Sequence, residues 1–269
     1  MDIDLDHFKT WTEYWGAVAS TTDRWEDKHG NPQERVSTIY GFENFTEQHQ
    51  DARYGSITET SGSVFGYVTA GSITLHDKNS ETMGLTLKTG RYFSVPAPVA
   101  FELAPFSRIV AIHSSPFTAL RQFGGPIEPK GRLRYIDGCS DSLLISPPRL
   151  GEPCLNLLHF PPNIHQTAHT HPSVRCGAIS SGRGYCIDGD KDQLDLLAGM
   201  IWVIPNNTIH SFHTYENADL NVIAYHPDSD WGPEDEEHPM LNRTWVDGSK
   251  IDNTKEQHMN PDIMKTETT

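Results

Sequence analysis

Large apolar residues near the N-terminus recur at helical spacing. Phe8, Trp11, Trp15 and Val18 follow one another at steps of three and four residues, which would place all four side chains on one face of a helix. The spacing predicts a helix within residues 1–22, packed by this face over a sheet.

Two blocks of short apolar runs follow, and turn-forming Gly, Ser, Asn and Pro interrupt both. Such runs predict the strands of a β-sandwich or β-barrel, and the similar size of the two blocks suggests an internal repeat. The stretch between them is irregular, and the chain after the second block is polar and acidic. We therefore expect a helical extension at 1–35, a first β-domain at 36–120, a connection at 121–150, a second β-domain at 151–228, and a polar strap and tail at 229–269.

Composition excludes some partners. The 269 residues include 21 Lys and Arg against 36 Asp and Glu, a formal net charge of −15. Nucleic acids and anionic membranes attract basic surfaces, so we expect neither as a partner. The sequence has no apolar run long enough for a membrane span, and its acidic start lacks the features of a signal peptide. Its four cysteines have no CxxC spacing, and we expect reduced thiols in a cytoplasmic protein.

The second block contains a cluster of histidines. His165, His169 and His171 lie within seven residues, and His210 and His213 follow about forty residues later. In an extended segment alternate residues face the same side, so His169 and His171 would point together. Imidazole is the commonest metal ligand near neutral pH, and the cluster therefore indicates a metal site.

The wider spacing resembles the two motifs of the cupin superfamily. The cupin motifs are Gly-x5-His-x-His-x3,4-Glu-x6-Gly and Gly-x5-Pro-x-Gly-x2-His-x3-Asn. In this chain they read Asn163-x5-His169-x-His171-x3-Arg175-x6-Gly182 and Gly199-x5-Pro205-x-Asn207-x2-His210-x3-Thr214. Asn replaces Gly at two turn positions, and Asn is the residue that best tolerates a positive φ there.

The first block matches the same template without its ligands. Gly71, Gly90 and Pro96 fall in register, whereas the four ligand positions hold residues that cannot bind a metal, namely Thr58, Thr60, Val64 and Phe101. The resemblance therefore implies a bicupin, an all-β chain with two double-stranded β-helix barrels, of which the first is degenerate. Cupins frequently form dimers, so we expect a homodimer.

Arg175 stands where the cupin pattern has a glutamate ligand. An arginine stays protonated and cannot bind a cation, which leaves His169, His171 and His210 as the metal ligands. The resemblance is then to the three-His cupin dioxygenases, and it implies iron(II), with a small anionic molecule and dioxygen as partners. Imidazole also suits other metals, so manganese, nickel, copper and zinc stay open.

The roles of several neighbouring residues stay open. Arg175 either projects into the barrel and binds the anionic group of a substrate, or pairs with a structural acid. His165 is a fourth ligand, a catalytic base or an exposed loop residue, and His213 faces away from His210. Three aromatic residues are candidates for the lining of the barrel, namely Trp202, Phe212 and Tyr225.

Three functions compete at this point. The first is an iron(II)-dependent oxygenase with Arg175 as the substrate anchor. The second is a metal-dependent lyase or isomerase, in which His165 would move a proton. The third is a cupin that binds a small molecule without chemistry, against which the retention of three histidines in register argues.

Overall fold

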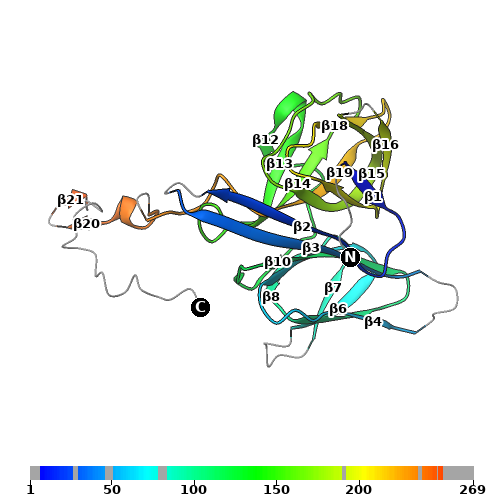
Figure 1. Cartoon of the computed structure of the whole chain (residues 1–269), viewed down its shortest axis with the longest axis horizontal. Helices are drawn as coiled ribbons and strands as arrows, with labels where there is room; N and C mark the ends of the chain where they lie inside the picture. Colours follow the sequence, from blue (N-terminus) through cyan, green and yellow to red (C-terminus); the bar gives the residue numbers. More distant parts are fainter. Residues whose placement is uncertain are drawn as a thin grey trace.

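The computed structural model describes residues 7–26, 30–45, 51–77, 84–189, 192–235, 238–246 and 248–250. Within these ranges every strand pairing is antiparallel, and the only helical elements are two 3-10 turns, η1 (Ile136–Gly138) and η2 (Leu241–Arg243). Figure 1 shows two β-bodies, with two long strands, β2 and β3, along the boundary between them. The predicted all-β class with two barrels is confirmed. Among the described residues no helix is long and apolar enough to cross a lipid bilayer.

The N-terminal barrel encloses an aromatic-rich core between two sheets. The larger sheet has the order β11 (Gln122–Gly124), β8 (Tyr92–Pro96), β5 (Ser63–Ala70), β10 (Ser107–Ser115), β3 (Pro32–Asn44) and β2 (Gly16–Glu26). The smaller sheet has the order β4 (Arg53–Ile57), β9 (Val99–Leu103), β6 (Ser72–Asp77) and β7 (Leu85–Lys88).

The C-terminal barrel is one strongly bent sheet. Its main path has the order β1 (Lys9–Trp11), β17 (Ile201–Ile204), β15 (Arg175–Asp188), β19 (Leu220–His226), β14 (Cys154–Phe160), β13 (Ser140–Ile145) and β12 (Leu133–Arg134). The first half of β15 pairs with β17 and β19, and its second half pairs with β16 (Gln193–Leu197) and β18 (His210–Thr214). This change of partners, at a register shift between Ile179 and Ser181, closes the barrel.

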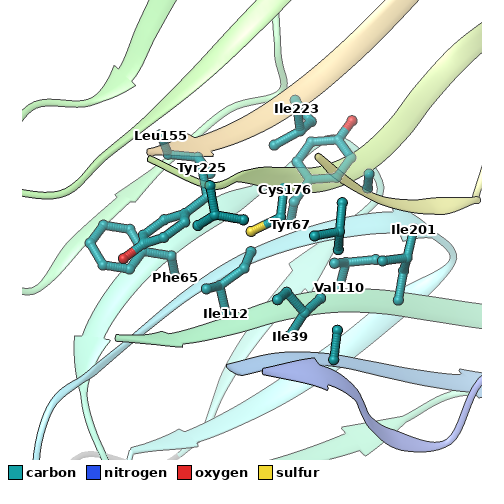
Figure 2. Packing of buried hydrophobic residues seen from close by; sticks show 14 of the residues in the cluster. Ile39, Phe65, Tyr67, Val110, Ile112, Leu155, Cys176, Ile201, Ile223 and Tyr225 are labelled. Atoms are coloured by element: carbon teal, nitrogen blue, oxygen red, sulfur yellow. The ribbon is translucent and has the colours of Figure 1, made fainter. Parts of the chain in front are cut away.

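An apolar interface joins the two barrels. Because side chains alternate along a strand, β15 points Ile179 into its own barrel and Cys176 and Ala178 toward the other one. Figure 2 shows Leu155, Cys176, Ile223 and Tyr225 opposite a second group, which comprises Ile39, Phe65, Tyr67, Val110 and Ile112 from β3, β5 and β10. We call this cluster the interdomain core.

The predicted N-terminal helix is wrong. Residues 9–11 form β1 on the C-terminal barrel, and residues 16–26 form β2 on the N-terminal barrel. The four large residues have separate destinations: Phe8 packs inside the C-terminal barrel, Trp11 and Val18 at the interdomain core, and Trp15 is 43% exposed. The helical spacing is therefore coincidental, since the four residues lie in and around two consecutive strands. The second strand begins at Gly16, whose φ is +105°.

The turn positions of the cupin-like motifs have the expected backbone. Asn163 and Asn207 adopt φ values of +61° and +56°, in the left-handed region that Gly would otherwise occupy. Asn207 donates its backbone N–H to the carbonyl of His171 at 2.7 Å, so this turn also ties the second motif to the first.

The segments outside the two predicted β-domains contact both barrels. Residues 121–150 link the barrels and supply β11 to one and β12 and β13 to the other. Residues 229–235 bind back on the connection, since the backbone N–H groups of Leu150 and Gly151 donate to Pro233 and Ser229. Beyond them lies a short hairpin of β20 (Trp245–Val246) and β21 (Ser249–Lys250). The tail predicted after residue 250 falls outside the described residues.

Candidate metal centre

The structure brings His169, His171 and His210 together at one end of the C-terminal barrel. His169 and His210 exchange backbone hydrogen bonds, with both N···O distances at 3.0 Å, and this bridge fixes the loop before β15 against the start of β18. His171 lies two residues further on and therefore faces the same side. One ring nitrogen from each of the three lies within 4.8 Å of the others, as a shared metal ion requires.

Backbone carbonyls orient two of the three rings. Nδ1 of His169 lies 2.8 Å from the carbonyl oxygen of Thr167, and Nδ1 of His210 lies 2.9 Å from that of Thr208. A carbonyl oxygen only accepts, so in the neutral form of each ring Nδ1 carries the proton and Nε2 has the lone pair. Fixing the tautomer in this way is the usual support for a metal-binding histidine.

Two of the rings are held neutral. Burial, followed by the charges of Arg175, His210 and His169, lowers the pKa of His171 to about 3. Burial is also the largest effect at His210 and lowers its pKa to about 4, although the bond to Thr208 acts in the opposite direction. Neutral imidazoles are the form that binds a metal, so near neutral pH these two rings need lose no proton to do so.

The histidines open on a pocket inside the barrel. The pocket has a volume of about 480 Å³ including its mouth. Its wall combines apolar residues with polar and titratable ones. The lining residues are Tyr135, Asp141, Asn156, Leu158, Phe160, Gln166, His169, His171, Arg175, Trp202, Ile204, His210, Phe212, Ala224 and His226. The enclosed part of this space is only about 70 Å³, which limits a ligand to a small molecule.

Arg175 lines this pocket and also makes structural contacts. Its Nη1 donates to the carbonyls of Ser173 and Val174, to the Ser173 hydroxyl, and to Asp228 at 3.3 Å. Its Nε is buried and has no partner in the described structure. The two interpretations from the sequence are therefore compatible, because one nitrogen pairs with a structural acid while another is left for a ligand.

His165 lies outside the pocket lining. Its Nδ1 is 3.3 Å from Nδ1 of His213, whose Nε2 is 2.8 Å from the Ser211 hydroxyl and whose ring stacks on Tyr185. Burial and the nearby His165 lower the pKa of His213. The structure thus places His165 beside His213 and apart from the three clustered histidines.

The sequence left several polar lining residues unassigned. Asn156 and His226 are the clearest examples. Asn156 could have been found from the sequence, because it is a polar residue at the same alternation as Leu158 and Phe160, which face inward from the same strand. Of the three aromatic candidates, Trp202 and Phe212 line the pocket, whereas Tyr225 lies in the interdomain core. Tyr225 is a core residue because its strand phase matches that of Ile223.

The corresponding place in the N-terminal barrel is filled with side chains. Phe101 and Val64 are fully buried in its core, and Thr58 and Thr60 are exposed. Phe101 packs on Phe42 at a ring separation of 5.5 Å. In the part of the chain that the structure describes, His169, His171 and His210 form the single group of three potential metal ligands.

Comparison with known proteins identifies the fold. No protein-family model matches the sequence, and no curated protein matches it significantly. Among solved structures, the chain is similar to a cupin 2 conserved barrel domain protein from Leptotrichia buccalis, with a TM-score of 0.53 and 12% identity over 85% of this chain and 100% of that one. It is similar to protein Ylba from E. coli, of the DUF861 family, with a TM-score of 0.54 and 16% identity over 86% and 95% of the two chains.

A third similar structure is the putative glyoxylate induced protein from Pseudomonas aeruginosa. It has a TM-score of 0.54 and 11% identity over 87% of this chain and 93% of that one. At these identities the similarity concerns the path of the backbone. The chain has the fold of the cupin barrel proteins.

Proposed function

We propose that the chain is a metal-dependent enzyme, and specifically an iron(II) oxygenase that acts on a small anionic organic molecule in the pocket of the C-terminal barrel. The observation that supports this most directly is the shared pocket of the three histidines and Arg175. The donor set fits a transition metal, because two of its imidazoles are held neutral and two have Nδ1 bound to carbonyls.

Each residue would have a distinct task. His169 and His210 would hold the ion through Nε2, and His171 would complete the set. A bound iron(II) ion would supply redox chemistry with dioxygen, and manganese, nickel, copper and zinc are the competing ions. Arg175 would bind and orient the anionic group of the substrate through its unpaired Nε.

The charge balance favours an oxygenase over a redox-neutral enzyme. Three neutral ligands and a nearby arginine leave a strongly positive site, since Arg175 replaces the glutamate of the cupin pattern and repels a cation. A substrate anion would offset both positive charges. We therefore infer that oxygen is consumed only when the substrate is present, which protects the empty enzyme from oxidation.

Oxygen uptake after anaerobic loading with iron(II) tests the proposal. We expect one metal ion per chain, little uptake by the enzyme alone, and rapid uptake with one member of a panel of small carboxylates, thiols, diols and phosphonates. The double variant His169→Ala/His171→Ala should bind no metal. Arg175→Leu should bind metal but lose uptake, and the exposed Arg183→Leu should resemble the wild type.

Two outcomes would contradict the proposal. Equal turnover under strict anaerobiosis, or with zinc in place of iron, would point to a lyase or isomerase. If the protein binds no metal, the remaining alternative is a protein that binds a small molecule without catalysis.

A further inference from the structure

Three unpaired polar atoms lie around the pocket. In the described part of the chain nine buried side-chain nitrogen or oxygen atoms lack a hydrogen-bond partner, and three of them belong to residues of the pocket wall. These are Nε of Arg175, Nε1 of Trp202 and Oδ1 of Asn156. Buried polar atoms are normally paired, so unpaired ones around a pocket indicate groups that a ligand completes.

The sheet places Trp202 and Asn156 on opposite sides of a floor of small residues. Across neighbouring strands Trp202 lies opposite Gly177, Gly177 opposite Ala224, and Ala224 opposite Asn156. A Cβ at Gly177 would lie 2.0 Å from the carbonyl oxygen of Ile223, so this position admits only glycine. Gly177 and Ala224 therefore place no long side chain between the indole of Trp202 and the amide of Asn156.

Two residues of the pocket wall offer donors. The Trp202 side chain is 1% exposed and is fixed by ring contacts to Phe8 at 6.4 Å and Phe212 at 5.8 Å. The indole N–H and the guanidinium Nε–H of Arg175 can only donate. Two donors without partners in the wall of one pocket suit the oxygens of an acid group.

A third residue of the wall offers an acceptor. Nδ2 of Asn156 lies 3.0 and 3.1 Å from the two carboxylate oxygens of Asp141, and a carboxylate accepts. This contact fixes the orientation of the amide and leaves its Oδ1 as the unpaired end. An amide oxygen can only accept, so its partner must carry an O–H or N–H group.

We propose that the substrate is a small organic acid that also carries a hydroxyl or amino group. Arg175 and Trp202 bind the acid group, and Oδ1 of Asn156 accepts a hydrogen bond from the hydroxyl or amino group. This inference rests on the proposed function, since it takes the same pocket and the same anionic substrate class. Asp141 acts as a positioning residue that holds the Asn156 amide in the accepting orientation.

Calorimetric binding of matched acids to the full-length protein tests the inference. The probes are propionate, lactate, alanine and 2-methoxypropionate, which share a carbon skeleton and differ in the donor. We expect lactate or alanine to bind about tenfold more tightly than propionate and 2-methoxypropionate, the value of one additional hydrogen bond. Both metal-free and zinc-loaded protein are titrated, because the metal-free protein removes any preference caused by chelation of the metal.

Variants separate the donor contacts from the acceptor contact. Asn156→Leu should reduce the preference to within about twofold and leave propionate binding unchanged, whereas Trp202→Phe should weaken all four acids and keep the preference. The exposed Asn217→Leu is the matched control and should keep both. If Asn156→Leu does not fold, as judged by its melting transition, the isosteric Asp141→Asn should also weaken the preference, because the amide could then turn.

Each outcome decides the inference. The inference is overturned if the preference for lactate or alanine survives in Asn156→Leu. If Asn156→Leu does not fold, survival of the preference in Asp141→Asn overturns it in the same way. So does tighter binding of propionate than of lactate and alanine, or a failure of all four acids to bind either form. If the preference is confirmed but no oxygen is consumed, the inference about the substrate class stands and only the proposed oxygenase activity is rejected.

Discussion

The three clustered histidines are oriented or kept neutral by their immediate neighbours. The carbonyls of Thr167 and Thr208 fix the tautomers of His169 and His210, and burial together with the Arg175 charge disfavours the protonated form of His210. Burial is the main cause at both His171 and His210, and the Arg175 charge adds to it, so protons would compete little with a bound metal. A site of this kind should bind its metal over a wide pH range.

The pH dependence of metal affinity tests this at the residue scale. A protonated imidazole cannot bind a metal, and with pKa values of about 3 and 4, His171 and His210 are unprotonated between pH 5 and pH 7. At most one of the three ligands can then exchange a proton in this range. We expect the logarithm of the zinc dissociation constant to change by no more than about one unit per pH unit.

Competition with a chelator of known pH dependence measures this slope. A slope of two or more would mean that His171 or His210 is protonated before the metal binds. That result would contradict the neutral ligand set inferred for the site.

At the element scale the sequence predicted the strands and turns better than the N-terminal segment. Motif spacing located the turns of Asn163 and Asn207, because a positive φ restricts the residues that a position accepts. The spacing of Phe8 and Val18 was misleading, because their burial depends on two different barrels. Asn156 was not identified from the sequence. The alternation along its strand predicts which side of the sheet its side chain lies on, but its distance from Trp202 depends on the curvature of the sheet.

Strand β2 supports the element that carries Arg175. Asp23 on β2 is 3% exposed, and its Oδ1 accepts the backbone N–H of Val174 at 2.9 Å. Asp23→Ala would leave this buried N–H unpaired, and we expect a loss of about 1–3 kcal/mol in the free energy of unfolding. Asp23→Asn keeps the acceptor and should lose less. Urea denaturation of the two variants and the wild type measures the difference.

The same residue gives a signed pH dependence. Burial raises the pKa of Asp23, and the Asp228 charge adds to this, although the bond from Val174 acts in the opposite direction. The folded state then holds a proton that the unfolded state releases, so this group makes the wild type less stable as pH rises from about 4 toward the raised pKa. Relative to the wild type, Asp23→Asn should gain stability over this window. A constant difference from pH 4 to pH 7 would contradict the raised pKa.

At the scale of the whole molecule, the two barrels share one core. The central strands β5, β10, β15 and β19 each present one apolar face to their own barrel and the other to the interdomain core. Three tyrosine hydroxyls also bond between the barrels: Tyr14 to the Gly199 carbonyl, Tyr67 to Ser180, and Tyr225 to Ser114. Among its described residues the N-terminal barrel has no group of three potential metal ligands, and it packs against the sheet that carries Arg175.

This arrangement predicts that the two barrels unfold together. Phe65 of the N-terminal barrel packs against Tyr225 of the C-terminal barrel at a ring separation of 5.2 Å, and both side chains are fully buried. Phe65→Ala should cost about 3–5 kcal/mol, because it removes apolar area and leaves a cavity at the interface. The matched control is Phe106→Ala in the same barrel, where the side chain is 67% exposed and the change should be within about 0.5 kcal/mol.

Chemical denaturation followed by two probes measures this coupling. Circular dichroism reports all the strands, and release of bound zinc reports the pocket of the C-terminal barrel. We expect the two probes to give one coincident transition in the wild type, and both to shift to lower denaturant by the same amount in Phe65→Ala. If Phe65→Ala lost half of its strand signal while zinc stayed bound, the barrels would be independent units, and the interdomain core would support only the one that contains the mutation.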